Sequence, residues 1–273
     1  GLDSFRANML SDKRIRYIFD YINAKDCFPT SSIGGGVNYI LWDANYHGDC
    51  SITTVQGLLR DTVSRPLDQF AVFIRYNPAI HIIQKCQSDK TFASIVSTRN
   101  PFGLSSNIRG DKSGDLRLIS SEGVSWLPKT AVSASNQLLS KYKIFMSKVT
   151  AEHAGEPDKN GQFRIVSRTE IIGPNDVCTD SYLIIGASED KSIVENEYKY
   201  IQTRFARFLL MLAVSSINLS PDKFQFIPLQ DFTEKSDIDW NKTILEIDQQ
   251  FYRKYKLSDE EIYFIEKMVK PIQ

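Results

Sequence analysis

The first third of the chain consists of short apolar runs separated by polar turns. Apolar residues at three- and four-residue spacing predict an amphipathic helix that contains Leu2, Phe5, Met9 and Leu10. Two further runs predict strands at residues 15–21 and 37–42, after which the chain turns into the segment 50–55. One helix and a few strands bury too little surface to form an α/β domain alone. We therefore expect this segment to pack on the remainder of the chain and to leave an apolar face exposed.

The middle of the chain combines one helix signal with loops and alternating runs. Asn77 followed by Pro78 predicts a helix start, with Asn77 as the N-cap. The Gly-, Ser- and Asn-rich stretch from Pro101 to Gly123 predicts one or two long surface loops. Alternating runs at 141–148, 163–171 and 177–185 predict a small twisted sheet whose polar edges carry Lys143, Arg164 and Arg168.

The last part of the chain has the periodicity of long helices. An apolar stripe from Val194 to Leu212 predicts one long helix that faces the core. Ser258 and Glu261 form a capping-box pattern that starts a final helix, which Pro271 ends. The sequence therefore predicts an α+β fold with a small twisted sheet and long C-terminal helices.

Composition bears on several classes of protein: nucleic-acid-binding, membrane, disulfide-bonded and zinc-binding. The 273 residues carry 33 basic and 33 acidic side chains, so no overall charge favours nucleic acid or membrane. The sequence has neither a membrane-spanning run nor an apolar leader, and we expect a cytoplasmic protein without a membrane partner. Four cysteines lie far apart in the sequence and have no CxxC spacing. We expect buried, reduced thiols rather than zinc ligands or disulfides.

The charge is uneven along the chain. Residues 99–148 contain eight basic and three acidic side chains, whereas the final forty residues are acidic on balance. A basic segment of this kind is the better place for phosphate contacts. Each lysine in it can equally well belong to an ordinary solvated surface.

Several short segments together resemble a known family. They are Leu2-Asp3-x-Phe5-Arg6-x-x-Met9-Leu10, Asp26-Cys27-Phe28-Pro29, Gly35-Gly36-Val37-x-Tyr39-x-Leu41-Trp42-Asp43, Arg99-Asn100-Pro101-Phe102-Gly103, Cys178-Thr179-x-Ser181-Tyr182-Leu183 and Phe226-x-Pro228-Leu229-Gln230-Asp231-Phe232. The chain resembles the C-terminal part of adenine-specific DNA methyltransferases of bacterial type II restriction–modification systems, which can be fused to or partnered with a restriction nuclease. The likeness covers nearly the whole sequence.

This resemblance implies two parts. Residues 1–55 would end a Rossmann-like catalytic domain, and residues 56–273 would form a mixed α/β target-recognition domain that binds double-stranded DNA. Within this domain the basic segment is the expected DNA-binding surface: we expect Arg99, Lys129, Lys143 and Lys148 to contact the DNA backbone, with Asn100 and Arg109 as candidate base readers. Phosphate contacts would position the duplex, and contacts in the groove would specify it.

The motifs that would carry out the methylation are missing from the sequence. The family binds S-adenosylmethionine on a glycine-rich turn and holds the target adenine in an Asn/Asp-Pro-Pro-aromatic loop. The nearest segments, at residues 77–80 and 100–103, lack the second proline. We therefore expect a fragment without cofactor or catalytic activity, whose N-terminal catalytic part lies in the same parent polypeptide.

Two other functions have some support from the sequence. The acidic C-terminal helices and the aromatic stretch 224–232 suit a protein-interaction module that docks a nuclease or specificity subunit. Pro157-Asp158 followed by Glu189-Asp190-Lys191 has the letters of a PD…ExK nuclease metal site. That short pattern lies in polar surroundings, and we expect it to be accidental. The three histidines have no metal-ligand spacing.

Overall fold

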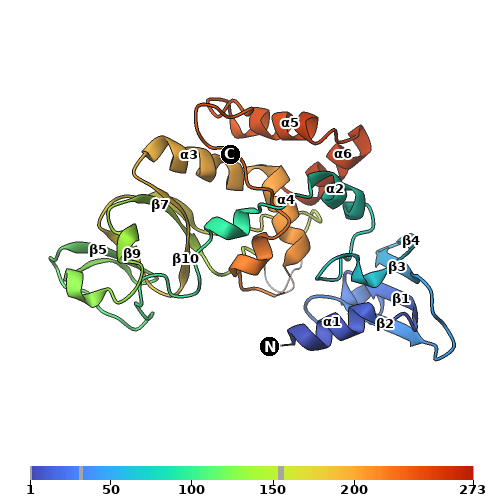
Figure 1. Ribbon diagram of the computed structural model, residues 1–273. Helices are drawn as coiled ribbons and strands as arrows, with labels where there is room; N and C mark the ends of the chain where they lie inside the picture. The colour runs from blue at the N-terminus through green and yellow to red at the C-terminus, as the bar shows by residue number, and fades with distance from the viewer. Residues whose placement is uncertain (1, 31–32, 153–156, 215, 273) are drawn as a thin grey trace.

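The protein is arranged as three sheet-containing parts in a row. The computed structural model describes residues 2–30, 33–152, 157–214 and 216–272, and within these ranges there are six α-helices and three β-sheets. Figure 1 shows the N-terminal sheet at one end, a central sheet with most of the helices to one side of it, and a smaller outer sheet at the other end. This mixture of separate helices and small sheets confirms the predicted α+β class. No helix in the described ranges is long and apolar enough to cross a membrane.

The N-terminal part is a four-stranded sheet with one helix. Helix α1 (Asp3–Ser11) precedes strands β1 (Ile15–Tyr21), β2 (Val37–Trp42), β3 (Cys50–Gln56) and β4 (Leu59–Arg65), which lie in the order β2-β1-β3-β4. Strand β1 runs antiparallel to β2 and parallel to β3. The two strands predicted at residues 15–21 and 37–42 are confirmed. The sheet extends to Arg65, beyond the boundary predicted after residue 55, and a small core of its own joins it to α1.

The central part holds most of the apolar core. Strands β7 (Tyr142–Ser147), β8 (Thr169–Ile172) and β10 (Tyr182–Ser188) form an antiparallel sheet in the order β10-β7-β8. Helix α3 (Lys191–Gln202) packs on this sheet, and to the same side lie α2 (Ala79–Cys86), α4 (Arg204–Ala213), α5 (Ile244–Lys254) and α6 (Asp259–Met268). The predicted capping box at the start of α6 is present, and a second one at Thr243 starts α5.

The outer sheet was not predicted. It contains β5 (Leu116–Ser120), β6 (Gly123–Leu127) and β9 (Asp176–Cys178) in the order β6-β5-β9. The stretch expected to be loop up to Gly123 therefore ends in a strand. The run predicted at 177–185 is two strands in two sheets, because a turn at Thr179–Tyr182 separates them. Of the predicted run 163–171, only Thr169–Ile171 lies in a strand.

The predicted long helix is broken at Thr203. This residue is extended, with ψ of 150°, and its side chain accepts a hydrogen bond from Ala206 N. The buried Asp248 carboxylate accepts from the backbone N–H groups of Arg204 and Phe205 at 3.1 and 2.9 Å. These oxygens satisfy amides that begin a new helix and lack intrahelical partners. The continuous helix expected from Val194 to Leu212 is therefore wrong, although both of its halves face the core.

Asn77 does not cap α2. Its side-chain amide instead donates to the carbonyls of Ile52 and Asp61 on strands β3 and β4, at 3.5 and 3.3 Å. Residue 77 thus ties the segment before α2 to the N-terminal sheet. The helix start was predicted correctly, and the role of its first polar side chain was not.

The cysteines behave as small apolar residues. All four are free, and Cys50, Cys86 and Cys178 are buried. Burial raises the pKa of Cys50 to about 11 and that of Cys178 to about 12, so these thiols stay protonated at neutral pH. The expectation of buried thiols is confirmed for these three residues.

Candidate nucleic-acid interface

Two of the predicted DNA-binding cations lie at one end of the central sheet. Residues 96 and 97 run along the free edge of β10, where Ser97 N donates to Ile184 O at 2.7 Å. Lys148 follows β7 directly, and its N–H donates to Ser181 O at 3.0 Å, just before β10. The chain therefore brings Arg99 and Lys148 to the same end of β10.

The charges of these two residues are close enough to affect each other. Burial lowers the pKa of Lys148, and the positive charge of Arg99 lowers it further, whereas Asp180 acts in the opposite direction. Arg99 is exposed and Lys148 is half-buried. Neither side chain forms an ion pair with a carboxylate in the part of the chain that the structure describes. Two neighbouring cations with little compensation form a site that favours an anion such as phosphate.

Asn100 sits beside this pair in a constrained turn. Its φ of 60° lies in the left-handed region, and Pro101 and Phe102 behind it are buried. The side-chain oxygen of Asn100 is also buried and has no hydrogen-bond partner among the described residues. This oxygen does not face solvent, so reading a base in this conformation would fall to the amide nitrogen.

Arg109 and Lys129 belong to the outer part instead. Arg109 forms an exposed ion pair with Glu122 of 2.6 Å, and it donates to the carbonyls of Ser106 and Ile108. Lys129 is exposed, and its backbone N–H donates to Asp115. Both remain candidate DNA contacts on the outer part of the protein.

Lys143 must be removed from the candidate phosphate contacts. Its side chain is fully buried, and Nζ donates to the carbonyls of Lys141 and Gly173, each at 2.9 Å. Burial lowers the pKa of Lys143 to about 8. The alternating pattern placed this residue on a polar edge, whereas the outer sheet packs over it and the two carbonyls hold its ammonium group.

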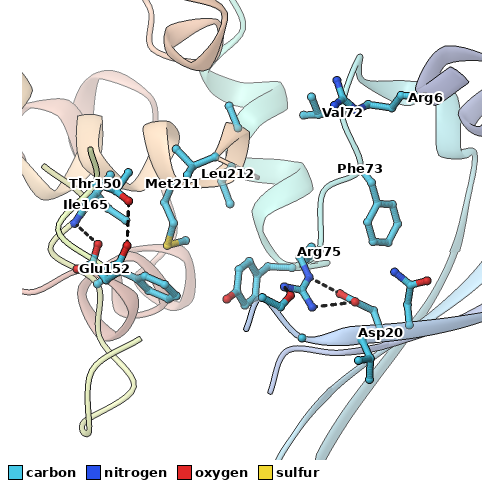
Figure 2. A pocket seen from close by; sticks show the side chains of 18 residues that line it. Arg6, Asp20, Val72, Phe73, Arg75, Thr150, Glu152, Ile165, Met211 and Leu212 are labelled. Atoms are coloured by element: carbon cyan, nitrogen blue, oxygen red, sulfur yellow. Dashed lines mark hydrogen bonds and ion pairs between the residues drawn. The ribbon is translucent and has the colours of Figure 1, made fainter. Parts of the chain in front are cut away.

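Sequence reasoning missed a cleft between the N-terminal and central parts (Figure 2). The cavity has a volume of about 330 Å³. On one side Arg75 forms a two-pronged ion pair with the buried Asp20, at 2.7 and 2.9 Å, and also donates to Gly35 O and Tyr21 O. Met211, Leu212 and Ile165 form the opposite wall.

The charged groups that the structure describes in the cleft are already paired. Its central cation and anion neutralise each other, and Glu152 on the far wall accepts hydrogen bonds from the backbone N–H groups of Arg164 and Ile165. Asp20 and Arg75 are 55 residues apart, so no local spacing could have predicted their pairing.

The PD…ExK pattern does not form a metal centre in the described residues. The carboxylate of Asp158 pairs with Lys270 at 2.7 Å and accepts from the N–H groups of Asn160 and Gln162. The Lys270 side chain, chiefly, lowers the pKa of Asp158 to about 2. Lys191 pairs with Glu195 at 2.8 Å. Among the residues that the structure describes, no group of three or more potential metal ligands comes together.

The aromatic stretch proposed for a protein partner is mostly core. Phe224, Ile227 and Phe232 are buried in the main cluster, and Phe92 packs against the rings of Phe224 and Phe232. Gln230 is buried as well and donates to Pro228 O and Tyr255 Oη. This segment therefore does not present the apolar surface that such a docking role requires.

Comparison with known proteins gives one short sequence match. No family model matches the chain. A stretch of 51 residues, or 19% of the chain, is 37% identical to a Mycoplasma pneumoniae protein described as an uncharacterized adenine-specific methylase, of which it covers 12%. The structure of the type IIG restriction endonuclease BpuSI aligns over 90% of this chain and 40% of its own, with a TM-score of 0.36 and 10% identity. The chain thus spans less than half the length of either protein.

Proposed function

We propose that this chain binds duplex DNA and recognises the sequence around the target adenine, as part of an adenine-specific methyltransferase in a restriction–modification system. The single observation that carries the proposal is the pair of neighbouring, little-compensated cations Arg99 and Lys148. The 51-residue similarity to an adenine-specific methylase supports the same assignment.

Different residues would contact the phosphates and the bases of the duplex. Arg99 and Lys148 would bind phosphate oxygens and fix the duplex on the protein. Asn100 at the adjacent turn, together with Arg109 and Lys129 on the outer part, would extend the contact toward the bases. S-adenosylmethionine and the flipped adenine would be held by a catalytic part with its own motifs, and a nuclease would be a further partner in the system.

The test is a salt series with duplex DNA. Fluorescence anisotropy of a labelled duplex should report a dissociation constant on the order of 10⁻⁴ to 10⁻⁶ M at physiological salt, and log–log dependence on salt with a slope of roughly −0.9 for each phosphate contacted. Binding that is absent, or that does not change with salt, would contradict the proposal. The interaction-module alternative would then be preferred.

A further inference from the structure

A short two-stranded ribbon continues the chain at the end of strand β7, where Lys148 lies. Thr150 N donates to Ile217 O at 2.9 Å, and Leu219 N donates to Lys148 O at 2.6 Å. Residues 148–150 therefore run antiparallel to a segment about seventy positions further along the sequence. This ribbon places a second stretch of chain directly beside one of the two proposed phosphate contacts.

Val149 and Asn218 are opposite each other in the ribbon. The hydrogen bonds on either side of them make this a non-hydrogen-bonded antiparallel pair, in which the two side chains lie close together on one face. Asn218 is exposed to solvent, and Val149 is exposed by 44%. A side-chain amide and an apolar side chain are thus held next to each other at the surface, and Val149 directly follows Lys148 in the chain.

The backbone of Asn218 is held in place, whereas its side chain is free. Its N–H donates to Ser216 Oγ at 3.4 Å, and the buried Leu219 follows it. Its side-chain amide makes no hydrogen bond to any residue that the structure describes. Asn100 differs, because its side-chain oxygen is buried. Asn218 can therefore offer a donor and an acceptor together from a fixed position.

The two side chains match the major-groove edge of an A·T base pair. Adenine presents the N7 acceptor and the N6 amino donor there, and asparagine can bind both at once. Guanine presents only acceptors, so the asparagine oxygen would lose its partner. The thymine of the same pair presents a methyl group, which favours apolar contact. The groove also has room for a two-stranded ribbon.

We propose that Asn218 is a specificity-determining residue, which reads an adenine of the recognition sequence through two hydrogen bonds in the major groove. Val149 contacts the methyl group of the paired thymine. This inference rests on the proposed function, because Arg99 and Lys148 have to hold the duplex for Asn218 to reach a base. Phosphate contacts set the register of a protein on DNA, and the backbone of residues 217–219 is bonded to that of Lys148 and Thr150.

The first experiment is selection from a pool of DNA duplexes with a randomised central segment, followed by sequencing of the bound fraction. The wild-type chain should prefer A·T at one position. Asn218→Ala should reduce that preference by roughly tenfold or more, the discrimination expected of one bidentate contact. Asn218→Gln can make the same two bonds and should keep part of the preference. Asn241→Ala, at another exposed asparagine, should keep all of it.

The second experiment uses the selected duplex with 7-deazaadenine at that position. This base lacks the N7 acceptor, so it should weaken binding of the wild-type chain and leave binding of Asn218→Ala unchanged. Salt titrations separate base reading from phosphate binding. Asn218→Ala should keep the wild-type salt slope, which also shows that the variant is folded, whereas Lys148→Ala should lower the slope by about one and keep the base preference.

The outcomes distinguish this inference from the proposed function on which it rests. Salt-dependent and sequence-selective binding in which Asn218→Ala keeps the wild-type preference at every position would overturn the role of Asn218 and leave the proposed function standing. Salt-dependent binding without any base preference would overturn this role and the recognition of sequence together. A wild-type chain that does not bind duplex DNA would overturn both proposals.

Discussion

The Lys143 ammonium group donates a 2.9 Å hydrogen bond to the carbonyl oxygen of Gly173, which fastens strand β7 to the turn between β8 and β9. Lys143 and Lys148 look alike in the sequence, but this buried contact gives Lys143 a different role. Lys143 holds the fold together, whereas Lys148 stands near Arg99 at the end of the sheet.

We expect Lys143→Ala and Lys148→Ala to have opposite effects. Lys148→Ala should reduce the salt slope of DNA binding by about one, if it removes one phosphate contact, and should leave stability nearly unchanged. Lys143→Ala should leave the slope alone and lower the free energy of unfolding by roughly 2 kcal/mol, because two buried carbonyls lose their donor. The measurements are anisotropy titrations and urea unfolding.

Lys267→Ala provides the control for both changes. This exposed lysine lies on α6, and its removal should alter neither stability nor the salt slope. Equal losses of slope in Lys148→Ala and Lys267→Ala would point to diffuse charge attraction instead of a defined contact.

Arg99→Ala should raise the pKa of Lys148. The arginine charge is one of the causes that lower this pKa in the wild type, and its removal leaves Asp180 to act against burial alone. An NMR titration of the lysine side-chain carbons should detect the change. Arg109→Ala, in the outer part, should have no such effect; an unchanged Lys148 pKa in Arg99→Ala would contradict the placement of the two cations.

Glu197 should make stability fall as pH rises. This residue of α3 is buried against Gly186, and its Oε2 has no partner among the described residues. Burial raises the pKa of Glu197 from 4.5 to about 7. In the unfolded chain Glu197 loses its proton near pH 4.5, whereas in the folded protein it keeps the proton up to about pH 7. The contribution of Glu197 to the free energy of unfolding is therefore fully present below pH 4.5. It is lost as the pH rises through about 7, by about 3 kcal/mol in total.

Glu197→Gln removes that titration. The variant should gain stability relative to wild type across the same pH interval, as measured by urea unfolding at a series of pH values. Glu195→Gln, on the same helix but half-exposed and paired with Lys191, should keep the wild-type pH dependence. A constant difference between Glu197→Gln and wild type at all pH values would refute the assignment.

Asp248→Ala should destabilise the start of α4. The Asp248 carboxylate accepts from two backbone N–H groups there, and both would be left buried without this partner. We expect a loss of roughly 2–4 kcal/mol in the free energy of unfolding. Asp259→Ala, at an exposed position in the first turn of α6, should change stability by less than about 0.5 kcal/mol.

Calorimetry should detect no complex between this chain and S-adenosylmethionine. The expectation rests on the sequence, which has neither the glycine-rich turn nor the Asn/Asp-Pro-Pro-aromatic loop that the resemblance associates with methyl transfer. A stoichiometric complex with a micromolar dissociation constant would show that the cofactor binds by other residues, and the proposed division of labour would then be wrong.

The sequence alone determined those elements that depend on local patterns. The strands at Ile15–Tyr21 and Val37–Trp42 have the predicted bounds, since alternating side chains and flanking turns specify a strand over a few residues. The capping box at Ser258 likewise needs only four consecutive residues to start α6. The apolar face expected on the N-terminal segment is also exposed, along Tyr39 to Trp42.

Only the tertiary structure decided features that depend on distant partners. The Asp248 carboxylate accepts hydrogen bonds from the backbone at the start of α4, at Arg204. The Gly173 carbonyl accepts a hydrogen bond from the buried Lys143 ammonium group. Arg75, which lies outside the N-terminal sheet, pairs with Asp20 on strand β1. A hydrogen-bond partner tens of residues away leaves no periodic trace in the sequence, because periodicity reports which face is buried and not what lies against it.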